Sequence, residues 1–168
     1  RILSSAASDV YKRQLLSLGE VYKGLGDAES ALAIWQEALE FVQKYGDLGG
    51  IATLHNYIGE FYRTTAQYDK ALDSFDSALK LLSRFGDRAG AGTTVFYIGR
   101  IYEDQRDYRR AIEYFEDALE IKKEVGDISS QIVLRNHIAY SQHAMGEISD
   151  ARATVSYTHL RAHETVVH

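Results

Sequence analysis

The side chains with the most reactive chemistry do not stand at spacings that build a catalytic or metal site. His137 and His143 are six residues apart, whereas two histidines must be four apart to share a helix face toward zinc. His55 stands near the expected start of a helix, and we expect it on the surface. The spacing therefore predicts no bound metal.

Nucleophile and phosphate motifs are also missing. The sequence has no cysteine, which excludes thiol nucleophiles, disulfides and cysteine-ligated zinc. No serine is framed by the glycines of a nucleophile elbow. The glycines follow a long regular period and form no phosphate-cradling loop. We therefore expect no enzymatic activity and no cofactor.

A forty-residue repeat organises the chain instead. Residues 97–127 resemble residues 57–87 and 17–47, and a degraded fourth copy begins at residue 137. Small and aromatic residues recur in register without an insertion: Gly19, Gly59, Gly99 and Ala139; Tyr22, Tyr62 and Tyr102; Trp35, Phe75 and Phe115. A fixed period of this size is typical of stacked arrays, which usually bind other molecules.

Each copy reads as two antiparallel helices. Apolar residues follow spacings of three and four, which predicts helices over about residues 89–105 and 108–125 in the third copy. The apolar stripe of the second of these helices includes Lys122. The chain has no proline, as suits an all-helical protein. We expect an all-α fold, an α-solenoid of about 3.5 repeats over residues 15–48, 49–88, 89–128 and 129–153.

The turns between helices carry matching chemistry. Gly46, Gly86 and Gly126 are each followed by an aspartate. The glycine can adopt the left-handed conformation that ends a helix, and the aspartate can cap the next helix. Asp27 and Asp107 are the expected N-caps within their copies, whereas Gln67 and Glu147 are poorer ones.

Composition narrows the function classes. The 168 residues have a net charge of −5, which argues against a nucleic-acid surface because that surface needs a basic face. No apolar run is long enough to span a bilayer. We expect a cytoplasmic protein with no nucleic-acid or membrane partner.

Both ends of the sequence look foreign. Residues 4–14 and 155–165 resemble translated sequencing-library adapter sequence. One codon choice for residues 9–14, read on the opposite strand, encodes residues 155–159. We expect residues 1–14 and 154–168 to be non-native, and residues 15–153 to be a repeat-array fragment of a larger protein, such as a metagenomic fragment.

The repeat signature resembles the tetratricopeptide family. The pattern Leu18-Gly19-x-x-Tyr22 with Ala31-x-x-x-Trp35 matches its motif, and the second and third copies repeat it at Gly59 and Gly99. The usual period of 34 residues is lengthened to forty here, and the family's early tryptophan and closing proline are absent. The resemblance implies a right-handed superhelix whose first helices line a concave groove.

That resemblance also implies which residues face a partner. The expected groove residues come from the first helices of copies two, three and four: Asn56, Tyr57, Glu60, Arg63; Phe96, Tyr97, Arg100, Glu103; Asn136, His137, Tyr140, His143. Aromatic, amide and charged side chains together suit a peptide. Arg63 and Arg100 are the best candidates to hold an acidic group. Tyr57, Tyr97 and His137 replace the asparagine of the family's carboxylate clamp.

A structural role for the same residues remains open. Charged residues one repeat apart, such as Glu60 and Arg100, could pair across neighbouring helices, and Tyr57 and Tyr97 could stack between repeats. The leading hypothesis is a scaffold that binds a protein or peptide in the groove. The alternatives are a regulatory or sensor domain of a signalling enzyme whose catalytic part is missing, and a self-association module.

Overall fold

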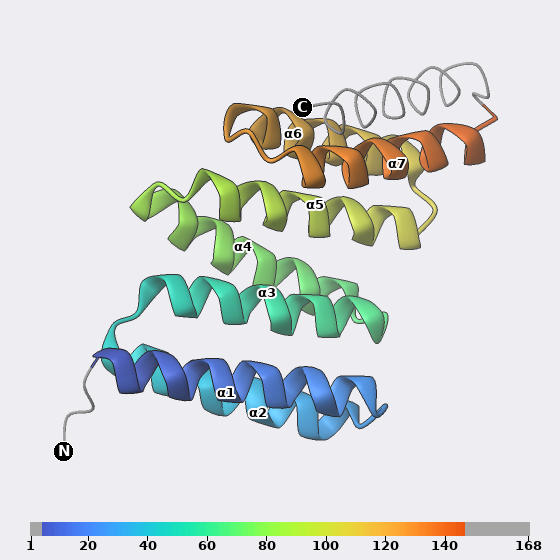
Figure 1. The fold of residues 1–168 in the computed structure, drawn as a ribbon. Helices are drawn as coiled ribbons and strands as arrows, with labels where there is room; N and C mark the ends of the chain where they lie inside the picture. The colour runs from blue at the N-terminus through green and yellow to red at the C-terminus, as the bar shows by residue number, and fades with distance from the viewer. Residues whose placement is uncertain (1–4, 147–168) are drawn as a thin grey trace, which may run out of the picture. The chain divides into compact units, whose positions relative to one another are not determined.

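A computed structural model describes residues 5–146, which are all-α. Seven helices occupy this part of the chain (Figure 1): α1 (Ser5–Gly24), α2 (Ala28–Tyr45), α3 (Leu48–Thr64), α4 (Tyr68–Phe85), α5 (Arg88–Asp104), α6 (Tyr108–Glu124) and α7 (Ile128–Ala144). The helix ends predicted for the third copy are therefore correct to within a residue. The described helices confirm the repeat-solenoid fold class.

The chain divides into two compact units between Gly86 and Asp87. Unit one holds α1 to α4, and unit two holds α5 to α7. Within them, α1 packs on α2, α2 on α3, α3 on α4, α5 on α6 and α6 on α7. The second helix predicted for copy four lies outside the described residues.

The helix turns confirm the predicted capping. Asp27, Asp47, Asp87, Asp107 and Asp127 each accept a hydrogen bond from the backbone N–H three residues on, at 2.8–3.2 Å. At the N-cap of α4, a glutamine makes no side-chain capping bond. The glycines of the three Gly-Asp pairs all have positive φ, between 69° and 76°. The turn chemistry predicted from the sequence is thus the chemistry found after α2, α4 and α6.

One aromatic side chain fills the centre of each helix pair. Trp35, Phe75 and Phe115 are completely buried. A Cβ on Gly59 would lie 2.5 Å from Phe75 Cε1, and a Cβ on Gly99 would lie 2.6 Å from Phe115 Cε1. The glycine of the first helix therefore makes room for the aromatic ring of the second.

The tyrosines that recur in each copy lie at the edge of these cores. Tyr22, Tyr62 and Tyr102 are half-buried and pack against buried residues of their own unit. Tyr102 stacks on Tyr114 with centroids 5.2 Å apart, and the Arg110 guanidinium lies 4.6 Å from its ring. These tyrosines therefore pack at the periphery of the cores.

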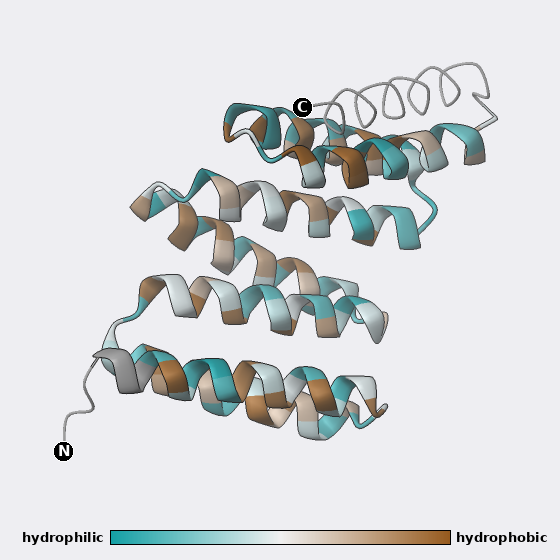
Figure 2. Cartoon of the chain, viewed as in Figure 1, coloured by the Kyte–Doolittle hydropathy of each residue, from teal (hydrophilic) through white to brown (hydrophobic). Residues whose placement is uncertain are grey.

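Each unit has its own hydrophobic core. In unit one, Leu54, Ile58 and Phe61 of α3 pack against the stripe of α2, and in unit two Leu134 and Ile138 of α7 pack against the stripe of α6. The helices carry both hydrophobic and hydrophilic residues (Figure 2). One helix pair leaves an apolar face that the next first helix covers.

The first half of α1 is made by residues that the sequence predicts to be non-native. Tyr11 donates a hydrogen bond to Glu37, and Lys12 pairs with Asp47 at 2.6 Å. The adapter hypothesis for these residues stays a prediction, and its C-terminal counterpart lies outside the described residues.

Candidate partner-binding surface

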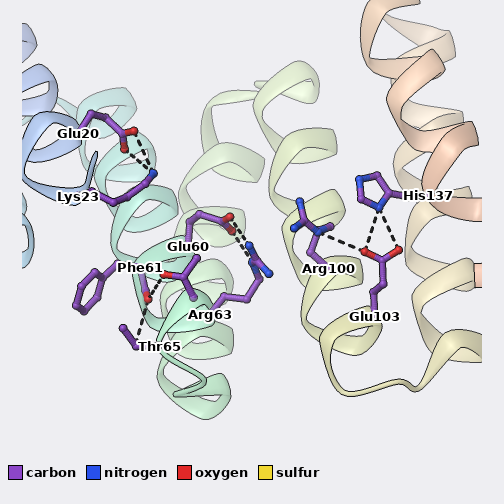
Figure 3. A network of polar contacts seen from close by, with 10 residues as sticks. Glu20, Lys23, Glu60, Phe61, Arg63, Thr65, Arg100, Glu103 and His137 are labelled. Carbon is purple, nitrogen blue, oxygen red and sulfur yellow. Dashed lines mark hydrogen bonds and ion pairs between the residues drawn. The ribbon is translucent and has the colours of Figure 1, made fainter. Parts of the chain in front are cut away.

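An ion pair between residues three apart recurs on the first helices. Glu20 pairs with Lys23 at 3.0 Å in α1, and Glu60 pairs with Arg63 at 2.7 Å in α3. In α5 the order of the charges is reversed, because Arg100 stands first and Glu103 second. This reversal changes what the two side chains can reach (Figure 3).

In α3 the two side chains of the pair bond mainly to each other. Arg63 donates to Glu60 through both Nε and Nη2, at 2.8 and 2.7 Å, and is only 8% exposed. Tyr57 lies against Trp35 of the preceding helix pair, with ring centroids 5.6 Å apart, as the stacking alternative predicted. Asn56 is half-buried and has a contact of its own. Arg63 thus has little capacity for a ligand.

In α5 the carboxylate turns toward α7 instead. Glu103 is 10% exposed, and both of its oxygens lie 3.0 Å from His137 Nδ1. The Ser141 hydroxyl also donates to Glu103, at 3.4 Å. Pairing of polar residues across neighbouring helices therefore does occur, between Glu103 and His137. The partners recorded for Glu60 and Arg100 lie in their own helices.

Arg100 is held in position, but its hydrogen-bond donors are not used up by neighbouring groups. Its Nε is buried and lies 3.4 Å from Glu103, yet it lacks a hydrogen-bond partner among the described residues. The guanidinium carbon lies 5.9 Å from the centroid of Phe96. Its terminal nitrogens point away from the Glu103 carboxylate (Figure 3). This arrangement leaves donors for a carboxylate on a partner.

The other predicted residues of unit two divide into packed and exposed groups. Phe96 contacts Phe115 and His137, with centroids 5.7 and 5.2 Å away, and Tyr97 contacts Phe96. Asn136, Tyr140 and His143 are exposed. The structure therefore brings Phe96, Arg100, Glu103 and His137 together.

A hollow of about 500 Å³ opens beside these residues on unit two. It is lined by four predicted residues and three that sequence reasoning missed: Glu103, Asn136, His137 and Tyr140; Asp104, Arg106 and Tyr108. We call it the Tyr108 pocket. The signal that could have found the missed residues is the turn position of Arg106, which is glycine in copies one and four.

The face of α1 away from α2 is apolar and uncovered. Leu18 and Val21 of α1 are 40% and 56% exposed, and Leu25, directly after the helix, is 75% exposed. Their counterparts Ile58 and Phe61 in α3, one repeat on, are buried. A shallow hollow of about 570 Å³ lies along this face of α1.

The capping aspartates and one histidine are among the groups with shifted pKa values. Hydrogen bonds from the Ser130 hydroxyl and backbone N–H lower the pKa of Asp127, and similar caps lower the pKa of Asp27 and Asp107. Burial lowers the pKa of His55. His55 is half-buried, so its predicted surface position was wrong: Leu54 and Ile58 place this part of α3 in the core.

Residues 5–146 contain no group of three or more histidine or acidic residues that could hold a metal ion. Over the same residues, none of the helices has the length and apolar character needed to cross a membrane.

Comparison with known proteins agrees with the predicted helical repeats. Residues 50–124 match the model of the tetratricopeptide repeat family, and this segment runs from α3 to the end of α6. A search of curated proteins found no match.

Solved structures of this architecture superimpose well. BtubC (BKLC) from P. vanneervenii shares 20% identity with a TM-score of 0.79, over 94% of this chain and 66% of its own. Aspartyl phosphate phosphatase F from Bacillus subtilis shares 18% identity with a TM-score of 0.85, over 92% and 41%. A signal transduction ATPase with a tetratricopeptide repeat sensor, from Pyrococcus horikoshii, shares 18% identity with a TM-score of 0.76, over 90% and 24%.

These similarities define the class of the protein. The helix pairs and their glycine–aromatic contacts form an all-α repeat solenoid, and residues 50–124 of it match the tetratricopeptide repeat family. Such repeats are typically non-catalytic and serve as protein-interaction or regulatory modules. The chain spans 66%, 41% and 24% of the three structures above.

Proposed function

We propose that this protein is a scaffold that binds a peptide or protein partner through the exposed faces of its first helices. Phe96, Arg100, Glu103, His137 and Tyr140 are the principal contacts in unit two. The observation that carries the proposal is the state of Arg100, which Glu103 and Phe96 hold in place while its terminal nitrogens point away from Glu103 (Figure 3). A held guanidinium loses little conformational entropy when it binds a carboxylate.

The proposal distinguishes the two candidate arginines. Arg63 gives two hydrogen bonds to Glu60 and is buried, so it stabilises α3. Arg100 is 27% exposed over its side chain and is the residue we expect to hold an acidic group of the partner. The partner sequence should therefore contain an aspartate, a glutamate or a free carboxyl terminus.

A peptide-display selection followed by fluorescence polarisation tests this. For a selected acidic peptide, Arg100→Ala should weaken binding by about 30-fold, the size of a typical interface hot spot. Arg100→Lys should be intermediate, because lysine cannot bind a carboxylate in a bidentate manner. Arg109→Ala, at an exposed position of α6, removes the same charge and should leave binding unchanged. Equal losses for both alanine variants would overturn the role of Arg100.

Self-association is a second candidate, and the uncovered face of α1 favours it. Leu18, Val21 and Leu25 are exposed where the equivalent face of α3 is buried. A second copy could cover this face, since a large apolar patch is costly in water. Sedimentation velocity over a range of concentrations should show association that Val21→Glu abolishes; a concentration-independent monomer would exclude it.

A regulatory domain of a larger signalling protein is the remaining alternative. The Pyrococcus horikoshii structure is described as a protein with a tetratricopeptide repeat sensor, and the present chain covers 24% of it. Reading the full gene would decide this alternative, since a catalytic domain in the same open reading frame would support it.

A further inference from the structure

Two tyrosine rings form one corner of the Tyr108 pocket. Tyr108 begins α6 and Tyr140 lies on α7, and their ring centroids are 6.3 Å apart with the planes at 80°. Tyr140 is 57% exposed, so the corner is open to a ligand. Tyrosine faces attract cations that approach within about 6 Å of the ring.

Acidic groups dominate the charge of the lining. Glu103 and Asp104 are carboxylates, and Arg106 is the one lysine or arginine among the lining residues of the pocket. Glu103 is nine-tenths buried and fixed by His137 and Ser141, whereas Arg106 is exposed at the turn. A fixed buried carboxylate together with a solvent-exposed guanidinium favours a positively charged ligand, because solvent screens the exposed charge more.

The repeat offers an internal comparison. Two repeats earlier, in unit one, the positions of Glu103, Asp104, Arg106 and Tyr108 hold smaller or oppositely charged residues: Lys23, Gly24, Gly26 and Ala28. The aromatic corner and the acidic pair therefore have no counterpart there. The pocket is a property of this copy and not of the repeat packing.

The backbone beside the pocket is strained. Arg106 has a φ of 61°, where Gly26 in copy one has 77°. A left-handed residue other than glycine costs roughly 1–2 kcal/mol, and such strain clusters at ligand sites. Ala66 has the same conformation in copy two, so this strain supports the pocket only together with its lining.

We propose that the Tyr108 pocket binds a basic side chain of a partner peptide, lysine or arginine. The ammonium or guanidinium packs in the corner of Tyr108 and Tyr140 and is attracted by the negative charge of Glu103. About 500 Å³ is ample for one side chain and falls in the range of ligand pockets. The inference rests on the proposed function, to which it adds a basic residue next to the acidic group held by Arg100.

The test uses amino-acid probes and the whole chain. Nα-acetyl-arginine amide, Nα-acetyl-glutamate amide and Nα-acetyl-leucine amide are titrated separately while the side-chain amide signals are followed by NMR. The arginine probe should shift the Asn136 amide saturably, and the other two should not. Asn56, which is two repeats earlier, is the internal control and should not move.

Matched variants locate the binding. Tyr108→Leu should weaken binding of the arginine probe about 3- to 30-fold, as expected for a cation–π contact of 0.5–2 kcal/mol. Glu103→Gln should also weaken it, because it removes a negative charge from the lining. Tyr68→Leu is the control at the same position one repeat earlier, and Glu120→Gln removes the same charge from an exposed site on α6. Both controls should bind like the parent, with circular dichroism confirming that every variant is folded.

Three outcomes overturn the proposal. They are an Asn136 shift with the glutamate probe instead of the arginine probe, no shift with the arginine probe, and folded pocket variants that bind as the parent does. If peptides depend on Arg100 but not on Tyr108, only the pocket proposal fails. If no peptide binds while the arginine probe still shifts Asn136, the proposed function fails and the pocket stands.

Discussion

At the scale of single residues, the repeat glycines are positions where no side chain fits. A Cβ on Gly99 would approach Phe115 Cε1 to 2.6 Å and Tyr114 Cβ to 3.2 Å. The Phe115 ring is completely buried, so it has no free space into which it can turn. Glycine is therefore needed at this position because the two helices are in close contact, and not because of its backbone conformation.

We expect Gly99→Ala to destabilise the protein by about 1–3 kcal/mol because it overpacks this contact, despite the better helix propensity of alanine. Urea unfolding followed by circular dichroism measures the change. Gly24→Ala is the control, since nothing lies within 4 Å of its Cβ position, and it should not destabilise. A Gly99→Ala variant as stable as the parent would contradict the close packing.

A second residue-scale feature is strain in the turn of copy two. Ala66 has a φ of 57°, at the position where copy one has Gly26 at 77°. Left-handed alanine is unfavourable because its Cβ crowds the following carbonyl.

Ala66→Gly should therefore stabilise the protein by about 0.5–1 kcal/mol, after allowing for the larger entropy of the unfolded glycine. The reciprocal change Gly26→Ala should destabilise it. Thermal melts of both variants give the sign, and a lower Tm for Ala66→Gly would refute the strain.

At the scale of elements, aspartates cap the N-termini of α2, α3, α5, α6 and α7. Asp127 accepts from the Ser130 backbone N–H at 3.1 Å and from its hydroxyl at 2.6 Å. These bonds lower the pKa of Asp127. The unfolded protein, with a pKa of about 3.9 for aspartate, therefore binds more protons than the folded protein in acid.

The stabilisation by Asp127 is thus complete above a pH of about 4 and is lost as the pH falls through the lower folded pKa. We expect Asp127→Asn to keep the cap near neutral pH while making stability fall less steeply in acid. Tm measured between pH 2 and 7 for parent and variant gives both slopes. Parallel curves would show that Asp127 does not contribute to the acid dependence.

A buried lysine also acts at this scale. Lys122 is 5% exposed in the apolar stripe of α6, where the sequence had placed it. Its ammonium donates to the Ala89 carbonyl and the Thr93 hydroxyl, each at 2.9 Å, and lies 3.4 Å from Asp127. It therefore ties the end of α6 to the start of α5, because a buried charge needs such partners.

At the scale of the molecule, each unit has its own buried aromatic core. Phe75 lies in unit one and Phe115 in unit two, and both are completely buried. Truncating either should cost about 3–5 kcal/mol. Because repeat proteins are stabilised by local contacts, the loss should concentrate in the unit that holds the change.

Hydrogen–deuterium exchange read by mass spectrometry tests this. Phe115→Ala should accelerate exchange in α5 to α7 more than in α1 to α4, and Phe75→Ala should show the opposite pattern. Uniform acceleration by both variants would mean that the units unfold as one.

The sequence by itself determined the helices, their ends and the contacts inside each pair. These follow from local patterns: apolar spacing of three and four, Gly-Asp turns, and a glycine sixteen residues before each aromatic. Such patterns repeat three times in register, which leaves little freedom for another fold.

Only the tertiary structure decided which of the predicted groove residues can meet a partner. Arg63 and Arg100 were equal candidates in the sequence. In the structure Arg63 is bonded twice to Glu60. Glu103 instead turns to His137 and contacts Arg100 only at its Nε. The Tyr108 pocket likewise joins residues some thirty positions apart. Contacts between neighbouring helices depend on the orientation of each side chain, which the one-dimensional pattern does not specify.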